Sequence, residues 1–97
     1  MIERVIVRRL AKEDIRAARS WYHKISPVLA DDFLAKLNRA IGLVRESPLA
    51  YGLVHRTFRR ILLHRFPYAL FYHADEQRIV IVAVLHQTRD PQMLAER

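Results

Sequence analysis

An α+β fold is predicted from two changes in the spacing of apolar residues along the chain. Apolar residues alternate weakly with arginines over residues 4–9, which is typical of a short edge strand. Over residues 11–46 they recur every three or four positions, which predicts helix. β-branched and aromatic residues then dominate residues 58–86. The sequence therefore predicts one strand, an antiparallel helical hairpin and a three-stranded antiparallel sheet.

The first predicted helix begins at Ala11 and has about four turns. Its apolar stripe consists of Ile15, Ala18, Tyr22 and Ile25, with lysines and arginines among the other positions. Trp21 and Tyr22 are adjacent, so their side chains diverge by about 100° and cannot both lie fully in the core. We expect one of the two to be partly exposed.

The second predicted helix begins at Ser26–Pro27. Serine can accept a hydrogen bond from an orphan amide, and proline fits the first helical position. Two aspartates at positions 31 and 32 are expected in the first turns, where the helix dipole favours negative charge. Pro48 disfavours helix for the residue before it, so the helix should end near Glu46. The apolar stripe consists of Leu29, Phe33, Leu37, Ala40, Ile41 and Val44.

The C-terminal half predicts three strands after a loop. Residues 48–57 contain a proline and a glycine and are expected to form that loop. Strands are predicted at residues 58–65, 67–74 and 78–86, with a polar turn between the last two. Both faces of the middle strand are partly apolar, which predicts a central position in the sheet. A short tail with one helical turn is expected at residues 92–97.

Composition limits the kind of protein. Ninety-seven residues with 52% hydrophobic content predict a single domain spanning residues 1–97. No cysteine is present, which excludes disulfides and thiolate metal sites, and no two histidines have the spacing of a helical metal pair. We expect no metal and no cofactor. The charged N-terminal residues and the lack of a long apolar run predict a soluble, cytoplasmic protein without a membrane partner.

The formal charge of +7 is shared almost evenly by the two halves of the chain, but no acidic residue lies between Glu46 and Asp75. Such a segment would create a positive surface suited to nucleic acid or to an acidic protein segment. A merely solvated face is the alternative. Two of its arginines, Arg60 and Arg65, are separated by an odd offset, so regular alternation predicts that they lie on opposite faces of one strand.

The end of the last strand carries a second group of candidate residues. His86 could act as a general acid or base, and Arg89 could hold a phosphate. The plainer interpretation is that His86 caps the strand and Arg89 pairs with Asp90. Together the candidate residues for binding a target are Arg59, Arg60, Arg65, His86 and Arg89.

A partner-binding groove is the third candidate site. A partly exposed Trp21 or Tyr22 could line, with residues of the second helix, a groove for a partner's amphipathic helix. The alternative is a wide core stripe with tryptophan at its margin. The groove candidates are Trp21, Tyr22, Phe33, Leu34 and Leu37.

Several short motifs resemble the RelE/ParE family of bacterial toxins. They are Trp21-Tyr22 in the first helix, Phe66-Pro67-Tyr68, and Val82 to His86 followed by Arg89-Asp90-Pro91. The order of the predicted elements matches that family over nearly the whole chain. The resemblance implies the toxin of a type II toxin–antitoxin pair, neutralised in a hetero-oligomer by a cognate, ParD-like antitoxin.

Departures from the family's patterns favour its ParE branch. Ribosome-dependent ribonucleases of the RelE branch carry an arginine after the first tyrosine of the middle strand and a tyrosine in the tail. This chain has Ala69 there and no tyrosine after Tyr72. The resemblance therefore favours a protein that inhibits DNA gyrase by binding over an enzyme. The alternatives are an mRNA endonuclease, with Arg60, His86 and Arg89 as candidate catalytic residues, and a non-toxic basic interaction domain.

Overall fold

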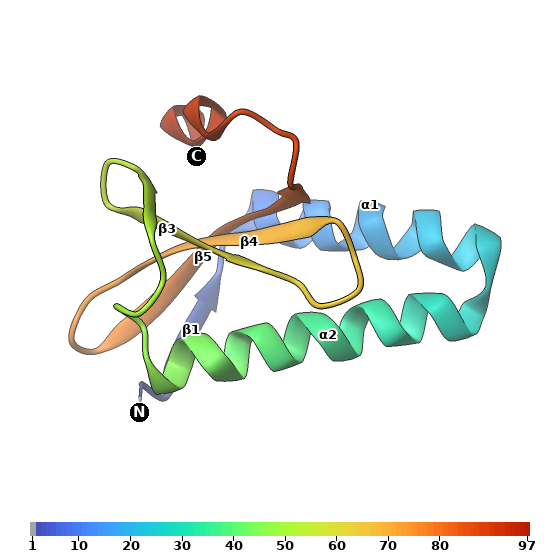
Figure 1. Cartoon of the computed structure of the whole chain (residues 1–97), viewed down its shortest axis with the longest axis horizontal. Helices are drawn as coiled ribbons and strands as arrows, with labels where there is room; N and C mark the ends of the chain where they lie inside the picture. Colours follow the sequence, from blue (N-terminus) through green and yellow to red (C-terminus); the bar gives the residue numbers. More distant parts are fainter. Residues whose placement is uncertain (1) are drawn as a thin grey trace.

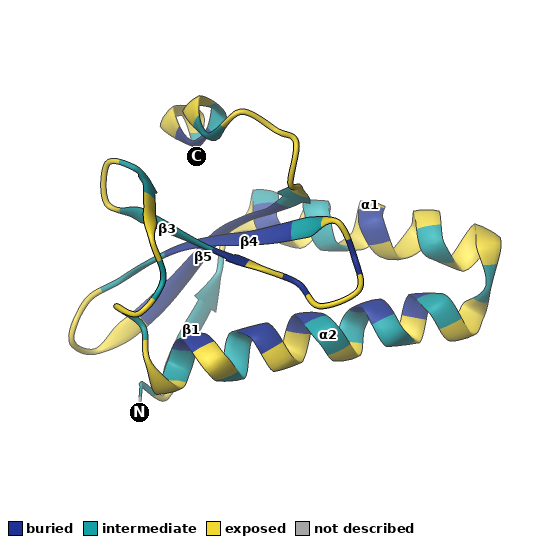
Figure 2. Ribbon diagram, in the orientation of Figure 1, coloured by how far each residue is buried: buried dark blue, intermediate teal, exposed yellow. Residues whose placement is uncertain are grey.

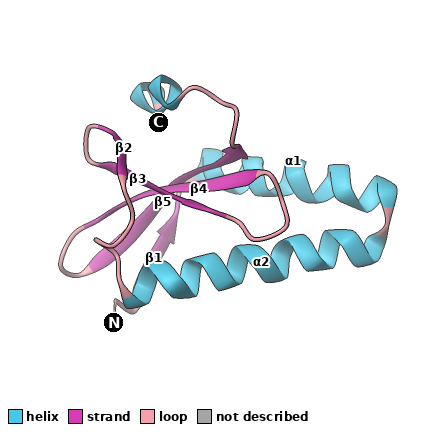
Figure 3. Ribbon diagram, in the orientation of Figure 1, coloured by secondary structure: helices cyan, strands magenta, loops and turns pink. Residues whose placement is uncertain are grey.

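The computed structural model describes residues 2–97 and contains one mixed sheet, a helical hairpin and a short C-terminal 3₁₀ helix (Figures 1 and 3). The elements in chain order are β1 (Arg4–Val7), α1 (Arg9–Ile25), α2 (Pro27–Glu46), β2 (Leu53–His55), β3 (Phe58–Leu62), β4 (Tyr68–Ala74), β5 (Arg78–His86) and η1 (Pro91–Glu96). The predicted fold class, the hairpin and the three long strands are confirmed. No helix among residues 2–97 is long and apolar enough to cross a membrane.

The sheet has the order β1-β5-β4-β3-β2. β1 runs parallel to β5, and the other neighbours are antiparallel. β4 is central and β1 lies at an edge, as the sequence predicts. The hairpin covers one face, and η1 lies on the other side of the sheet from α2 (Figure 1).

Four predicted details are wrong. α1 begins at Arg9, so the first strand is shorter than predicted. β2 lies inside the predicted loop; three residues are too few to show an alternating pattern. β3 ends at Leu62, and the predicted strand position Arg65 lies in the following turn with a φ of 71°. Ser26 occupies the N-cap of α2 with an extended backbone, yet its side chain makes no capping bond.

The two aspartates near the start of α2 are also misplaced by the sequence prediction. They lie beyond the first turn, where the dipole effect has faded. Asp32 instead accepts bonds from Lys36 at 3.0 Å and from Arg65 at 2.7 Å. Its role is to tie the β3–β4 loop to the hairpin.

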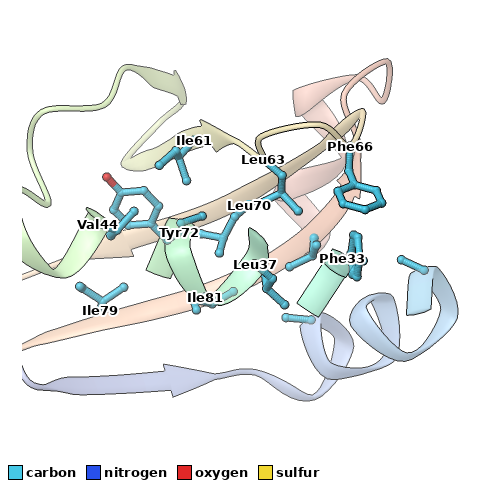
Figure 4. Packing of buried hydrophobic residues seen from close by; sticks show 14 residues of the cluster. Phe33, Leu37, Val44, Ile61, Leu63, Phe66, Leu70, Tyr72, Ile79 and Ile81 are labelled. Carbon is cyan, nitrogen blue, oxygen red and sulfur yellow. The ribbon is translucent and has the colours of Figure 1, made fainter. Parts of the chain in front are cut away.

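The main core lies between the hairpin and the sheet (Figure 4). α2 contributes Phe33, Leu37, Ala40 and Val44, and the facing sheet residues include Ile61, Leu70, Tyr72, Ile79 and Ile81. Burying an aliphatic or aromatic side chain of this size stabilises the fold by about 1.5–3 kcal/mol. A smaller cluster on the opposite face joins Phe71, Val80 and Val82 to Leu94 of η1.

The connected end of the hairpin extends beyond the sheet and is exposed there (Figures 1 and 2). Ile25, which the helical stripe predicts to be in the core, is 63% exposed, and Val28 is 77% exposed. The helical period is correct, but the sheet ends before these residues are reached.

β5 continues past the end of β1, and an ion pair satisfies the backbone groups left open at that edge. The Asp14 carboxylate accepts a bond from the Val84 amide at 3.1 Å and two bonds from the Arg97 guanidinium at 2.8 and 3.2 Å. Arg97 also donates to the Val82 carbonyl at 3.1 Å. Both charged side chains are largely buried. The pair holds η1 and the end of the chain against α1 and β5.

Candidate functional site

A shallow hollow of about 410 Å³ lies between α1 and the adjacent ends of β4 and β5. It brings together two predicted target-binding residues, His86 and Arg89, with Trp21, a predicted antitoxin-binding residue. The full lining is Asp14, Ala17, Ala18, Trp21, Tyr68, Val84, Leu85, His86 and Arg89. The two candidate surfaces that the sequence suggests separately therefore meet in one place.

Strand pairing fixes the position of His86. It is the last residue of β5 and pairs with Tyr68, the first residue of β4. The two rings form an edge-to-face contact with centroids 5.7 Å apart. The Arg89 amide donates to the His86 carbonyl at 3.0 Å, so a tight turn returns Arg89 toward the same hollow. The plainer interpretation, an ion pair between Arg89 and Asp90, does not occur among residues 2–97; Asp90 instead caps η1 through the Gln92 amide.

The surroundings of the His86 ring determine which nitrogen carries its proton. The Thr88 amide donates to Nδ1 at 3.3 Å, and the Thr88 hydroxyl lies 2.9 Å from the same atom. An amide N–H can only donate, so Nδ1 is the acceptor and the proton of the neutral ring is on Nε2. The ring is thus arranged to donate a hydrogen bond from Nε2. A general base would need that nitrogen free.

The three arginines of the basic segment have three different environments. Arg59 lies on the helix side of β3 and donates to the carbonyls of Tyr51 at 2.7 Å and Leu49 at 3.4 Å. Arg60 alternates to the opposite side, and pairs in register with Phe71. Arg65 is exposed and bonds Asp32 at 2.7 Å.

The alternation predicted between Arg60 and Arg65 does not apply, because β3 ends before Arg65. Neither arginine is buried: Arg60 is half-buried and Arg65 is exposed. Arg59 fixes the loop before β2, and Arg65 ties the β3–β4 loop to α2.

The three candidate catalytic residues do not come together. His86 and Arg89 share the hollow, whereas Arg60 is not part of its lining. Arg60 pairs with Phe71 and His86 pairs with Tyr68, three residues further along β4, or about 10 Å at 3.3 Å per residue. Alternation also puts them on opposite faces of the sheet. Ala69, at the position where the nuclease branch has arginine, is fully buried.

The antitoxin-binding candidates divide by exposure. Trp21 is 60% exposed, and Tyr22 is half-buried and packs on Phe33 and Phe66 with ring centroids 5.5 and 4.9 Å apart. Exposure of one member of the adjacent pair is confirmed. Phe33 and Leu37 are core residues, 0% and 3% exposed, so they present no surface for a groove in this conformation. Leu34 is half-buried.

The sequence analysis did not identify Asp14 and Arg97. Asp14 lines the hollow, and its carboxylate is held by the Arg97 guanidinium. They are 83 positions apart, and no local pattern connects them. It also missed the hydroxyl bond from Tyr72 to the Pro48 carbonyl at 2.6 Å. Over residues 2–97 no group of three or more histidines, aspartates or glutamates is arranged to hold a metal ion.

Comparison with known proteins places this geometry in a family. The family model described as "ParE toxin of type II toxin-antitoxin system, parDE" matches residues 5–91. No curated protein matches the sequence. A solved structure described as "Chromosomal ParDE TA system from P. aeruginosa" aligns with a TM-score of 0.76 and 17% identity, covering 88% of this chain and 96% of that one, which shows a shared fold. Because the family model spans most of the sequence, the chain belongs to the ParE toxins of type II toxin–antitoxin systems.

Proposed function

We propose that this ParE toxin arrests growth in the cytoplasm by binding DNA gyrase through the hollow that contains Trp21, His86 and Arg89. The hollow offers an exposed aromatic ring, a histidine N–H donor and a guanidinium within one surface. Aromatic and arginine side chains are the residues that most often dominate the energy of protein–protein interfaces. A binding surface is what this combination supports best.

Arg60 lies apart from His86 and Arg89, and this separation is the observation that favours binding over RNA cleavage. General acid–base cleavage needs its groups within hydrogen-bond reach of one reacting phosphate. Here the sheet lies between Arg60 and His86, and Ala69 is buried under η1. The Thr88 contacts also leave Nε2 of His86 as a donor. These features favour a ParE-type inhibitor over a RelE-type endonuclease.

A ParD-like antitoxin would neutralise the toxin by covering this same surface. Trp21 borders the hollow and is largely exposed, and Ile25 and Val28 continue the exposed apolar area along the hairpin. Arginines and histidine flank it on α1, so an amphipathic segment with acidic residues is the complementary partner. The target and the antitoxin would then compete for Trp21.

Gyrase inhibition tests the proposed target. We expect the purified toxin to inhibit supercoiling by gyrase, and Arg89→Gln to reduce that inhibition at least several-fold. Arg39→Gln, which removes the same charge from an exposed position on α2, is the matched control and should inhibit as the unaltered toxin does. Cleavage of messenger RNA in translating ribosomes, lost in Arg89→Gln, with gyrase unaffected, would contradict the proposal.

Trp21 itself reports on the antitoxin. It is the chain's one tryptophan, and its exposure predicts emission typical of a hydrated ring. Addition of a cognate antitoxin segment that lacks tryptophan should shift the emission to shorter wavelength and reduce quenching by iodide. Unchanged emission in a stable complex would place the antitoxin elsewhere on the toxin.

A further inference from the structure

The sheet face turned away from helices α1 and α2 carries a basic surface at its β1 edge, separate from the hollow. It is formed by Arg4, Arg8, His73 and Arg78, which we call the β1-edge cluster. Arg4 pairs in register with Arg78, and His73 pairs with Val80 two residues further along β5. Ile6 and Val80 belong to the cluster packed under η1, so alternation puts their neighbours at i ± 2 on that same face. None of these residues lines the hollow.

The cluster works against the stability of the fold. Like charges directly opposite each other on neighbouring strands are destabilising, and Arg4 and Arg78 are such a pair. Only one carboxylate contacts them within the described chain: Asp75 lies 3.3 Å from Nε of Arg78. The other oxygen of Asp75 accepts bonds from the amides of Gln77 and Arg78. Arg8 donates to the Arg97 backbone oxygen at 2.9 Å, whereas within residues 2–97 no side-chain carboxylate pairs with Arg4 or Arg8.

The ring of His73 lies in the positive potential of Arg8 and Arg78. Its Nε2 lies 3.4 Å from Nη2 of Arg8, and a guanidinium can only donate, so Nε2 is the acceptor and the ring is neutral. Burial lowers the pKa of His73, and the charges of Arg8 and Arg78 lower it further, against a smaller opposing effect of Asp75. Phe58 of β3 covers the ring from the other side, with centroids 5.7 Å apart. A bound anion would offset the repulsion between the protonated His73 ring and the two arginines.

We propose that the β1-edge cluster binds the backbone phosphates of a nucleic-acid duplex. Guanidinium groups match phosphate oxygens in a two-pronged geometry. Arg4 and Arg8 are four residues apart, or about 13 Å along an extended chain, and one strand of a duplex carries a phosphate about every 3.4 Å along its axis. The three arginines can therefore contact two or three phosphates at once.

A duplex fits this surface better than an acidic helix does. Docking of an amphipathic helix requires an apolar groove beside the charges. The apolar side chains of this face are covered instead: Phe71, Val80 and Val82 pack under Leu94 of η1. The exposed part of the surface is mainly guanidinium. This inference is independent of whether gyrase is the target.

Binding of a fluorescently labelled DNA duplex, followed by anisotropy over a range of salt concentrations, tests the proposal. Each contacted phosphate contributes about −0.9 to the slope of log K against log salt, so the unaltered toxin should show a slope of about −2 to −3. Arg4→Gln and Arg78→Gln should each lower the magnitude of the slope by about 0.9 and weaken binding several-fold. Circular dichroism would verify that each variant is folded.

Charge-matched controls separate this cluster from the general charge of the protein. Arg16→Gln and Arg39→Gln remove exposed arginines from the two helices and should leave the slope unchanged. Equal losses in all four variants would overturn the proposal. So would equally tight binding of polyglutamate that depends on Arg4 and Arg78, because the surface would then recognise an acidic polypeptide. Full displacement of the duplex by inorganic phosphate at constant ionic strength would identify a site for free phosphate instead.

Titration of His73 by NMR gives a readout that a structural role of the arginines would not move. The charged groups facing the ring are Arg8, Arg78 and Asp75, and the duplex should offset the two arginines. Saturating DNA is therefore expected to raise the pKa of His73 in the unaltered toxin. The ring signals of His23, on the exposed side of α1, serve as the control. An unmoved His73 titration under saturation would refute binding at this edge.

Discussion

Tyr72 provides the most quantitative test of the structure, because one buried hydroxyl has opposite effects at neutral and at alkaline pH. The side chain is fully buried in the main core (Figure 4), and its hydroxyl donates to the Pro48 carbonyl at 2.6 Å. Burial raises its pKa from 10.0 to about 12; the charge of Arg59 opposes the rise, and Tyr51 adds to it. The unfolded chain therefore ionises at a lower pH than the folded protein.

Removal of the hydroxyl by Tyr72→Phe should reverse the order of stability as the pH rises. At neutral pH the lost hydrogen bond costs about 1 kcal/mol. The group's pKa is raised on folding, so its contribution is complete below pH 10 and is lost as the pH rises toward 12. The loss is about 1.4 kcal/mol near pH 11 and about 2.3 kcal/mol near pH 12. The variant should thus become the more stable protein at about pH 11 and above.

Urea denaturation followed by far-ultraviolet circular dichroism at a series of pH values measures this crossing. Tyr68→Phe is the matched control at neutral pH, because the Tyr68 hydroxyl makes no hydrogen bond within residues 2–97 and its removal should cost less stability than Tyr72→Phe. Spectrophotometric titration of the tyrosines should show one fewer late-ionising group in Tyr72→Phe. Parallel stability curves for Tyr72→Phe and the unaltered protein would refute the reasoning.

Three further predictions concern the C-terminal ion pair, a left-handed residue and a histidine. Asp14→Asn should lower the free energy of unfolding by about 2 kcal/mol, because it weakens a largely buried pair with Arg97; unchanged urea midpoints would contradict this. Arg56→Gly should raise the free energy of unfolding by up to about 1 kcal/mol, because the φ of 51° suits glycine. The melting temperature should rise with it, and a lower melting temperature would contradict this prediction. Since folding lowers the pKa of His73 from 6.5, stability should fall as the pH drops below that value, and His73→Gln should reduce this dependence; identical profiles would exclude the effect.

Periodic elements were predictable from the sequence because each repeats its signal many times. The stripe of α2 gives four buried side chains from Phe33 to Val44, and the predicted bounds of α2 and β5 agree with the structure. β2 was not predictable, because three residues cannot display a period. The early end of β3 at Leu62, and the turn in which Arg65 has a φ of 71°, have no signal in the pattern of side chains.

The candidate site was predictable only in part. Adjacency of Trp21 and Tyr22 implied that one is exposed, but which one depends on how α1 is rotated against the sheet. Proximity of His86 to Trp21 is a property of tertiary packing, since α1 and β5 are distant in sequence. Exposed, periodic and local features can be read from a sequence, whereas contacts between distant elements require the fold.

Arg97 contacts residues of both the hollow and the β1-edge cluster. The Arg97 guanidinium bonds Asp14 in the lining of the hollow, and the Arg97 backbone oxygen accepts a bond from Nη1 of Arg8 at 2.9 Å. Arg8 in turn contacts His73. Three contacts in series, from His73 through Arg8 and Arg97 to Asp14, therefore join the β1-edge cluster to the lining of the hollow.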